Sequence, residues 1–176
     1  MDRLDDAVVI AMGSSLPGEY ASSTALLDAA LAAMPTMGLN VARRSGWWRS
    51  AAWPDPSKPD YLNGVALVET ALSPAAVMAR FLALERRFGR RRAARNDPRT
   101  LDLDLIAHGR AVIDTAGLVL PHPRAAERCF VMGPLAEVAP DWRHPVLGET
   151  AAALAARCTV GTDARPVDAS NRPERQ

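Results

Sequence analysis

The sequence predicts a single α+β domain with a mainly antiparallel sheet and helices packed on it. The chain has 176 residues, close to the roughly 150 of an ordinary domain, so one hydrophobic core is expected. Its 48% hydrophobic and 23% charged residues are typical of a globular protein and disfavour disorder. Short strand-like segments also alternate along the chain with segments of helical spacing.

The first half predicts a strand, a helix and a hairpin. Residues 8–13 form a β-branched apolar run that ends at glycine, as a buried strand does. Apolar residues then recur at helical spacing from Thr24 to a stop at Gly38. Residues 41–49 and 61–72 are strand-like, and the proline-rich stretch between them predicts a long hairpin loop.

The second half adds a helix that begins at the N-cap Ser73 and a strand over residues 100–107, whose apolar residues alternate strictly. The resulting βαββαβ order is that of a ferredoxin-like core with helices on one face of the sheet, which does not by itself specify a function. Further on, an apolar segment is expected to break at Pro134, and an alanine-rich helix follows over residues 148–158. Residues 159–176 are polar and expected to be disordered, which leaves a domain of residues 1–158.

Several classes of protein are excluded by composition. Basic and acidic residues number 21 and 20, so the net charge of +1 gives no general attraction to nucleic acid or membranes. No segment approaches the roughly 20 apolar residues of a membrane span, and the acidic N-terminus is unlike a secretory signal, so a cytoplasmic protein is expected. Cys129 and Cys158 lack zinc-ligand spacing and are expected to be reduced thiols. Lys58 follows no glycine-rich loop, which excludes a P-loop enzyme.

Asp102 and Asp104 carry the strongest chemical signal. In an alternating strand the flanking leucines face the core, and both carboxylates project from the other face, about 6 to 7 Å apart. Such a pair suits a hard divalent cation such as Mg²⁺, which takes its remaining ligands from phosphate and water. The alternative is an ordinary solvent-exposed strand face.

An arginine-rich segment, residues 90–99, leads directly into this strand. Guanidinium groups suit phosphate oxygens, so arginines beside a carboxylate pair indicate transfer from a polyphosphate. Alone, the same run is also typical of a solvated helix end or an RNA-binding patch.

These features, with others in the same order, resemble the 6-hydroxymethyl-7,8-dihydropterin pyrophosphokinase family. The motifs are residues 98–106 (PRTLDLDLI), 12–14, 59–63 and 120–123, followed by Arg128 and Phe130. The resemblance implies Mg²⁺-dependent transfer of pyrophosphate from ATP to the hydroxymethyl group of the pterin, with release of AMP, in folate biosynthesis. It implies pterin and ATP as partners, without nucleic acid or membrane, and is compatible with a monomer.

The resemblance also assigns roles to individual residues. Asp102 and Asp104 would hold two Mg²⁺ ions, and the catalytic group would also include Arg91, Arg92 and Arg99. The nucleotide-binding residues would be Glu85, Arg91, Arg99, His122 and Arg128. The pterin-binding residues would be Ser50, Tyr61, Asn63 and Phe130. Ser15, Asp97 and Pro123 depart from the family's usual residues.

Two other readings remain open at this point. A ferredoxin-like module could bind RNA through its arginine segment, although the carboxylate strand would then face the same polyanion. A domain that binds pterin or nucleotide without turnover would carry the same motifs. Tyr61 and Phe130 are, on sequence alone, as well explained as core aromatics.

Overall fold

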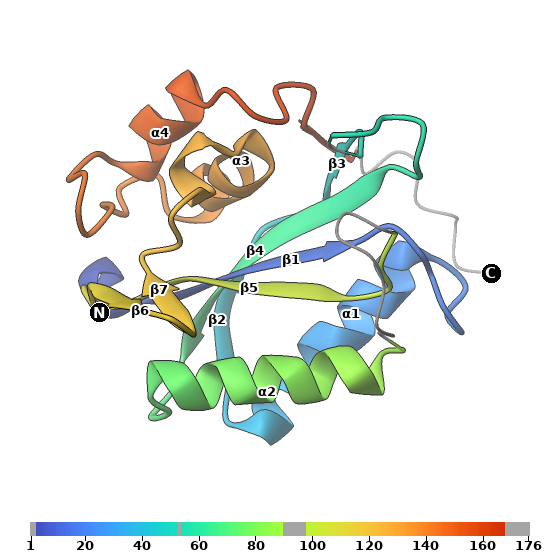
Figure 1. The fold of residues 1–176 in the computed structure, drawn as a ribbon, viewed down its shortest axis with the longest axis horizontal. Helices are drawn as coiled ribbons and strands as arrows, with labels where there is room; N and C mark the ends of the chain where they lie inside the picture. The colour runs from blue at the N-terminus through green and yellow to red at the C-terminus, as the bar shows by residue number, and fades with distance from the viewer. Residues whose placement is uncertain (1–2, 53, 90–97, 168–176) are drawn as a thin grey trace.

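The described residues, 3–52, 54–89 and 98–167, form a six-stranded antiparallel sheet with helices on both faces in this computed structural model (Figure 1). The strands of the sheet are β1 (Val8–Ser14), β2 (Asn40–Arg44), β3 (Trp48–Ser50), β4 (Tyr61–Glu69), β5 (Asp102–His108) and β8 (Arg165–Pro166). Their order is β5-β1-β4-β3-β8, and β2 also pairs with β4. A separate hairpin consists of β6 (Ile113–Thr115) and β7 (Leu118–Leu120).

The helices are α1 (Ser23–Ala33), α2 (Pro74–Arg87), α3 (Cys129–Val138) and α4 (Ala151–Arg157). Short 3₁₀ turns lie at Leu4–Asp6, Met34–Met37 and Ala125–Glu127. The hydroxyls of Ser22 and Ser73 accept hydrogen bonds from backbone N–H groups in the first turns of α1 and α2. The predicted βαββαβ order is confirmed, with the second strand divided into β2 and β3.

The expectation that the helices cover only one face of the sheet was wrong. Val8, Ile10 and Met12 pack with the cluster under α1 and α2, whereas Val9 and Ala11 pack with the cluster under α3 and α4. Every residue of β1 is buried, so both faces of the central strands need a cover. Figure 1 shows the two helical layers on opposite sides of the sheet.

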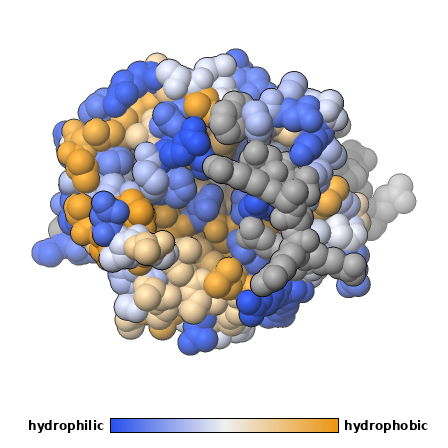
Figure 2. Space-filling view, in the orientation of Figure 1, coloured by the Kyte–Doolittle hydropathy of each residue, from blue (hydrophilic) through white to orange (hydrophobic). Residues whose placement is uncertain are grey.

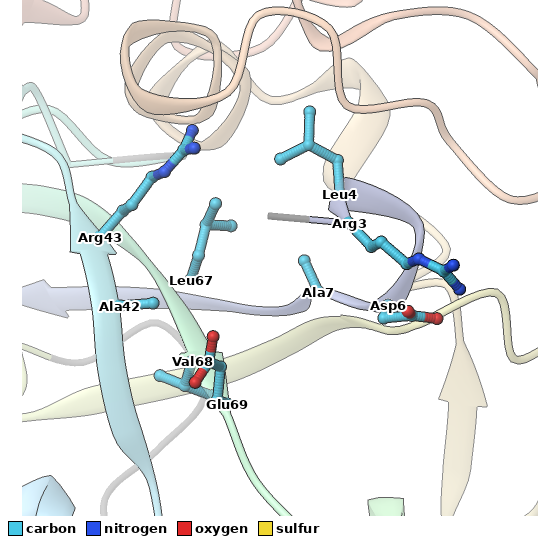
Figure 3. A pocket seen from close by; sticks show the side chains of 9 residues that line it. All are labelled: Arg3, Leu4, Asp6, Ala7, Ala42, Arg43, Leu67, Val68 and Glu69. Carbon is cyan, nitrogen blue, oxygen red and sulfur yellow. The ribbon is translucent and has the colours of Figure 1, made fainter. Parts of the chain in front are cut away.

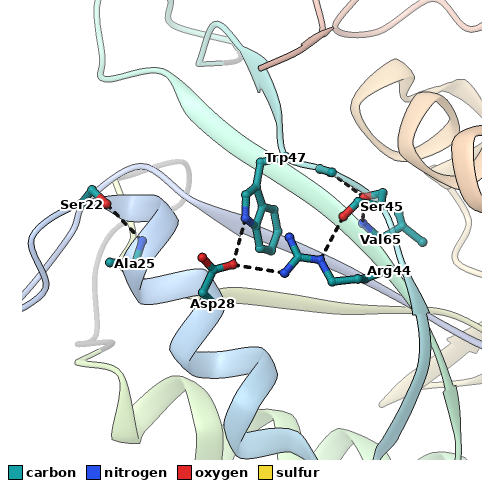
Figure 4. Close-up of polar contacts among 8 residues, drawn as sticks. Ser22, Ala25, Asp28, Arg44, Ser45, Trp47 and Val65 are labelled. Carbon is teal, nitrogen blue, oxygen red and sulfur yellow. Dashed lines mark hydrogen bonds and ion pairs between the residues drawn. The ribbon is translucent and has the colours of Figure 1, made fainter. Parts of the chain in front are cut away.

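The predicted strand over residues 41–49 is interrupted at Ser45, whose N–H donates to the Val65 carbonyl of β4 at 2.9 Å while its side chain takes the place of the second backbone contact. Its hydroxyl accepts a hydrogen bond from the Val65 N–H at 2.9 Å. Beside the interruption, Asp28 of α1 accepts hydrogen bonds from the indole of Trp47 at 3.1 Å and from Arg44 at 3.2 Å (Figure 4). These contacts join the helix layer to the start of β3.

Three further expectations are corrected. Pro134 lies inside α3, because the burial of Met132 and Leu135 offsets the one backbone hydrogen bond that proline removes. Cys129 and Cys158 form a disulfide bond instead of two thiols, since the fold brings the start of α3 to the end of α4. Residues 159–167 are ordered by backbone pairing to other segments, and residues 168–176 lie outside the described part of the chain.

Exposed apolar side chains gather near the β6–β7 hairpin and the loop before α4. Val112 and Val146 are 66% and 61% exposed. Figure 2 shows apolar colour mainly toward the left, where these elements lie in Figure 1. Within the described ranges, no helix combines the length and apolarity needed to cross a membrane.

Candidate functional site

The site lies at the end of the sheet where β1 finishes and β4 and β5 begin. In the register of these three strands, Gly13 stands between Asn63 on one side and Asp102 on the other. A cavity of about 310 Å³ opens here, on the sheet face that α3 covers farther along. It brings together the following residues singled out from the sequence: Ser50, Tyr61, Asn63, Arg99, Asp102, Asp104, His122, Arg128 and Phe130.

Asp102 and Asp104 project into this cavity as the strand period predicts. Leu101, Leu103 and Leu105 are buried on the opposite face, in the cluster under α1 and α2. Across the strand, the two aspartates pair with Gly13 and Ala11, whose small size leaves room beside the carboxylates.

The electrostatics of the carboxylate pair favour a cation. Burial, followed by the charge of Asp102, raises the pKa of Asp104 to about 6. Asp102 forms an ion pair with Arg99, with 3.1 Å between carboxylate oxygen and guanidinium nitrogen. Both side chains remain partly exposed to the cavity, at 25% for Arg99 and 29% for Asp102, so the ion pair does not close the site.

The residues present fit a divalent cation that shares its ligands with a substrate. Two carboxylates supply hard oxygen ligands, and a positive ion between them would offset the burial and the repulsion by Asp102 that raise the pKa of Asp104. Within the described ranges, this cavity included, no group of three or more His, Cys, Asp or Glu residues gathers as a metal site. The other ligands of such an ion would therefore be water or phosphate oxygens.

Arg99 is fixed by the turn after β1. Ser15 accepts a hydrogen bond from the Arg99 N–H at 3.0 Å through its hydroxyl, and its own N–H donates to the Arg99 carbonyl at 2.9 Å. Sequence reasoning treated Ser15 only as a departure from the family, and nothing local indicated this contact. Ser15 thus holds the backbone of Arg99, the residue whose guanidinium pairs with Asp102.

A second basic group lies across the cavity. Arg128 and Arg124 line it together with His122, whose backbone N–H donates to Ile106 at 2.8 Å. Burial foremost, and then the charges of Arg128 and Arg124, lower the pKa of His122 to about 4. This histidine is therefore neutral at pH 7, and Arg124, which the sequence did not single out as a site residue, adds positive charge.

The other end of the cavity is polar and aromatic. The Asn63 amide nitrogen donates a hydrogen bond to the Ser50 hydroxyl at 2.9 Å, and both residues are buried. Tyr61 and Phe130 line the same end. A slot with aromatic walls and one buried amide suits a flat heterocycle with a hydrogen-bonding edge.

Glu85 does not line the cavity. It is 3% exposed on α2, and its carboxyl accepts a hydrogen bond from the Leu103 N–H at 3.0 Å, beneath the carboxylate strand. This contact supports the carboxylate strand, and the nucleotide-binding role of Glu85 stays a prediction. Arg91 and Arg92 lie outside the described residues.

A smaller cavity of about 210 Å³ lies at the other ends of the same strands (Figure 3). Figure 3 shows Arg3 beside Asp6, and Arg43 with its guanidinium directed away from Glu69; the lining also includes the apolar side chain of Leu67. Because Leu67 pairs with Val9 while Asn63 pairs with Gly13, the two cavities are separated along β1 and β4.

Fold and site define a ferredoxin-like α+β protein in which carboxylates, arginines and a buried amide share one cavity. The sequence model of 7,8-dihydro-6-hydroxymethylpterin-pyrophosphokinase (HPPK) matches residues 9–140. The chain belongs to this family.

Individual relatives agree with this assignment. A 2-amino-4-hydroxy-6-hydroxymethyldihydropteridine pyrophosphokinase of Synechocystis is 47% identical over 64% of this chain and 57% of its own length. The protein of the same name from Methylorubrum extorquens is 37% identical over 75% and 82%. The chain spans just over half of the Synechocystis relative, and 21% of the folic acid synthesis protein fol1 of Pneumocystis carinii.

Among solved structures, the HPPK-DHPS protein of Plasmodium falciparum matches 85% of this chain and 42% of its own chain, with a TM-score of 0.64. Its sequence identity is 11%, so this likeness supports the fold alone.

Proposed function

We propose that this protein transfers pyrophosphate from ATP to the hydroxymethyl group of 6-hydroxymethyl-7,8-dihydropterin and releases AMP, as a step of folate biosynthesis. The observation that carries the proposal is the joining of two kinds of site in one cavity. Asp102, Asp104 and Arg99 lie at one end, and the Ser50–Asn63 pair lies at the other. A phosphate donor and a flat acceptor can therefore meet between them.

In this reaction the pterin hydroxyl oxygen forms a bond to the β-phosphorus of ATP. The bond from that phosphorus to the oxygen bridging it to the α-phosphate breaks, AMP leaves with that oxygen, and the hydroxyl proton passes to solvent. Asp102 and Asp104 would hold Mg²⁺, two ions in our proposal, and the bound metal would neutralise the charge of the triphosphate oxygens.

The chain's own residues would contribute chiefly by orientation and charge. Arg99 and Arg128 approach the cavity from different segments and can bind opposite sides of a polyphosphate. The Nδ1 atom of His122 accepts a hydrogen bond from the Arg124 N–H at 3.2 Å, so the neutral ring would offer its Nε2–H as a donor without adding charge. Since positioning supplies much of the acceleration in phosphoryl transfer, no strong general base is needed.

At the acceptor end, Asn63 would read the edge of the pterin ring. Its amide is held by Ser50, so the remaining donor and the carbonyl oxygen have a fixed direction. Tyr61 and Phe130 would contact the faces or edges of the ring. This arrangement supports a pterin better than an RNA base, because the carboxylates on the same face would repel a nucleic-acid backbone.

The proposal requires no nucleic acid and no membrane. It includes a cytoplasmic location, for which the Cys129–Cys158 disulfide is unusual. One chain supplies both ends of the cavity, so a monomer suffices as the working unit.

The test is an assay of AMP formation from ATP and the hydroxymethyl-dihydropterin, with and without Mg²⁺. We expect AMP only with both substrates and the metal. Asp102→Asn and Asp104→Asn should each lower turnover by about 100-fold or more, because the charge they compensate grows in the transition state. Asp114→Asn, at an exposed aspartate of β6, is the matched control and should leave turnover unchanged.

Binding of both substrates without AMP would instead identify a domain without turnover. Salt-dependent RNA binding with no AMP would support the RNA-binding alternative. Full activity in both aspartate variants would disprove the proposed role of the carboxylates.

A further inference from the structure

The C-terminal segment of residues 158–167, here called the strap, runs along the pterin end of the cavity. It follows α4 and ends in β8, and it lies beyond residues 9–140, which carry the family match. None of the sequence motifs that line the cavity includes a residue of the strap. Its contacts nevertheless reach the residues that form the acceptor end.

The strap is tied down at both ends. Cys158 is joined to Cys129 by the disulfide bond, and the Cys129 N–H donates to the Val160 carbonyl at 2.7 Å. At the other end, β8 pairs with β3, and the Val167 N–H donates to the Trp47 carbonyl at 2.9 Å. The strap therefore bridges α3, which carries Phe130, and β3, which ends at Ser50.

Gly161 brings the strap backbone against the Phe130 ring. A Cβ atom placed on Gly161 would lie 2.5 Å from Cδ1 of Phe130, and the glycine has a φ of +71°. Both the close approach and the left-handed backbone require glycine. The ring that lines the cavity is thus backed directly by the strap.

Asp163 makes the second contact. Its carboxylate accepts a hydrogen bond from the Ala51 N–H at 2.7 Å, and Ala51 lines the cavity next to Ser50. Ser50 in turn accepts from Asn63. A connected series therefore runs from Asp163 through the Ser50–Ala51 backbone to the buried amide.

We propose that Asp163 is a positioning residue for the acceptor site, and that the strap sets the width of the slot that holds the flat heteroaromatic ring. This inference rests on the proposed function. The strap fixes the slot from two sides, through Gly161 behind Phe130 and through Asp163 at Ala51. A carboxylate is a stronger acceptor than a neutral group, which suits it to anchor the first residue of the loop after β3.

The test compares Asp163→Ala with Asp163→Asn, which keeps a neutral acceptor. Isothermal titration would measure the dissociation constant of the hydroxymethyl-dihydropterin in the presence of Mg²⁺ and a non-hydrolysable ATP analogue, and that of the analogue alone. We expect Asp163→Ala to weaken pterin binding about tenfold and Asp163→Asn about twofold, with analogue affinity unchanged. The KM for pterin should rise accordingly, with little change in kcat.

Thr162→Ala is the matched control, since Thr162 is the exposed neighbour of Asp163 in the same strap. It should bind pterin as the unaltered protein does, and all three variants should melt within a few degrees of it. Unchanged pterin affinity in Asp163→Ala, or an equal loss of pterin and analogue affinity with a lower melting temperature, would overturn the positioning role. If the unaltered protein itself binds no pterin, the proposed function fails, and this inference fails with it.

Discussion

The Glu85 carboxyl and the Leu103 N–H form a hydrogen bond of 3.0 Å directly behind the carboxylate strand. Leu103 stands between Asp102 and Asp104, and β5 is an edge strand of the sheet, with β1 as its one neighbouring strand among the described residues. An edge strand has backbone groups that no neighbouring strand can satisfy. Glu85 supplies the missing acceptor from α2 and thereby fixes the strand that carries both aspartates.

Replacing Glu85 should therefore lower the stability of the folded protein, and this effect does not require a bound ligand. Glu85→Ala leaves a buried N–H without an acceptor, and we expect the free energy of unfolding to fall by about 1 to 3 kcal/mol. Glu85→Gln keeps an acceptor oxygen and should lose less. Urea denaturation measures both, with Glu19→Ala as the control at an exposed glutamate. Glu85→Ala with unaltered stability would show that the hydrogen bond does not support β5.

Gly13 provides a test of the cavity floor. A Cβ atom at Gly13 would lie 3.5 Å from the Asn63 Oδ1 atom, which is ordinary contact, so Gly13→Ala should fold normally. The larger side chain of Gly13→Val would fill the space between Asn63 and Asp102, and pterin affinity should fall about tenfold or more. Gly117→Ala, where an added Cβ meets no atom within 4 Å, is the control. Unchanged pterin affinity in Gly13→Val would place the ligand elsewhere.

The face of the sheet that carries Asp102 and Asp104 was predictable, because strand alternation depends only on neighbouring residues. The N-cap at Ser73 and the hairpin around residues 51–60 are likewise local and are confirmed. Local pattern could not show that α3 and α4 would cover the second sheet face. That depends on how much apolar surface the central strands leave on each side.

The contacts that support the site residues could not be predicted from the sequence either. The Ser15–Arg99 hydrogen bonds join residues 84 positions apart, and the Asp163–Ala51 bond joins residues 112 apart. Glu85 shows the same limit, since its motif position did not reveal the hydrogen bond that its carboxyl accepts from the Leu103 N–H in β5. Residue type identified the cavity-lining groups, but only the tertiary fold identifies what holds them.

His122 should make stability depend on pH. Its pKa is about 4 in the folded protein and near 6.5 in an unfolded chain, so the unfolded state binds the proton more readily. Stability should fall as the pH drops below 6.5, by at most about 2 kcal/mol at pH 5. His122→Asn should lose this part of the slope, as urea denaturation at pH 7.5, 6 and 5 would measure. His144, whose pKa burial also lowers, is present in both proteins and cancels in the comparison. Parallel curves for the two proteins would contradict the shift at His122.

The disulfide between Cys129 and Cys158 should stabilise both the fold and the acceptor end of the cavity. It closes a loop with a sequence separation of 29, for which the loss of unfolded-state entropy predicts about 3.6 kcal/mol. Cys129 lies between Arg128 and Phe130, so its release should also loosen the strap behind the Phe130 ring. We expect dithiothreitol to lower the melting temperature by several degrees and to weaken pterin binding more than nucleotide binding. The double variant Cys129→Ala/Cys158→Ala should melt at the lower temperature and not respond to dithiothreitol. Equal melting of the oxidised protein, the reduced protein and the double variant would show that the bond contributes nothing to stability.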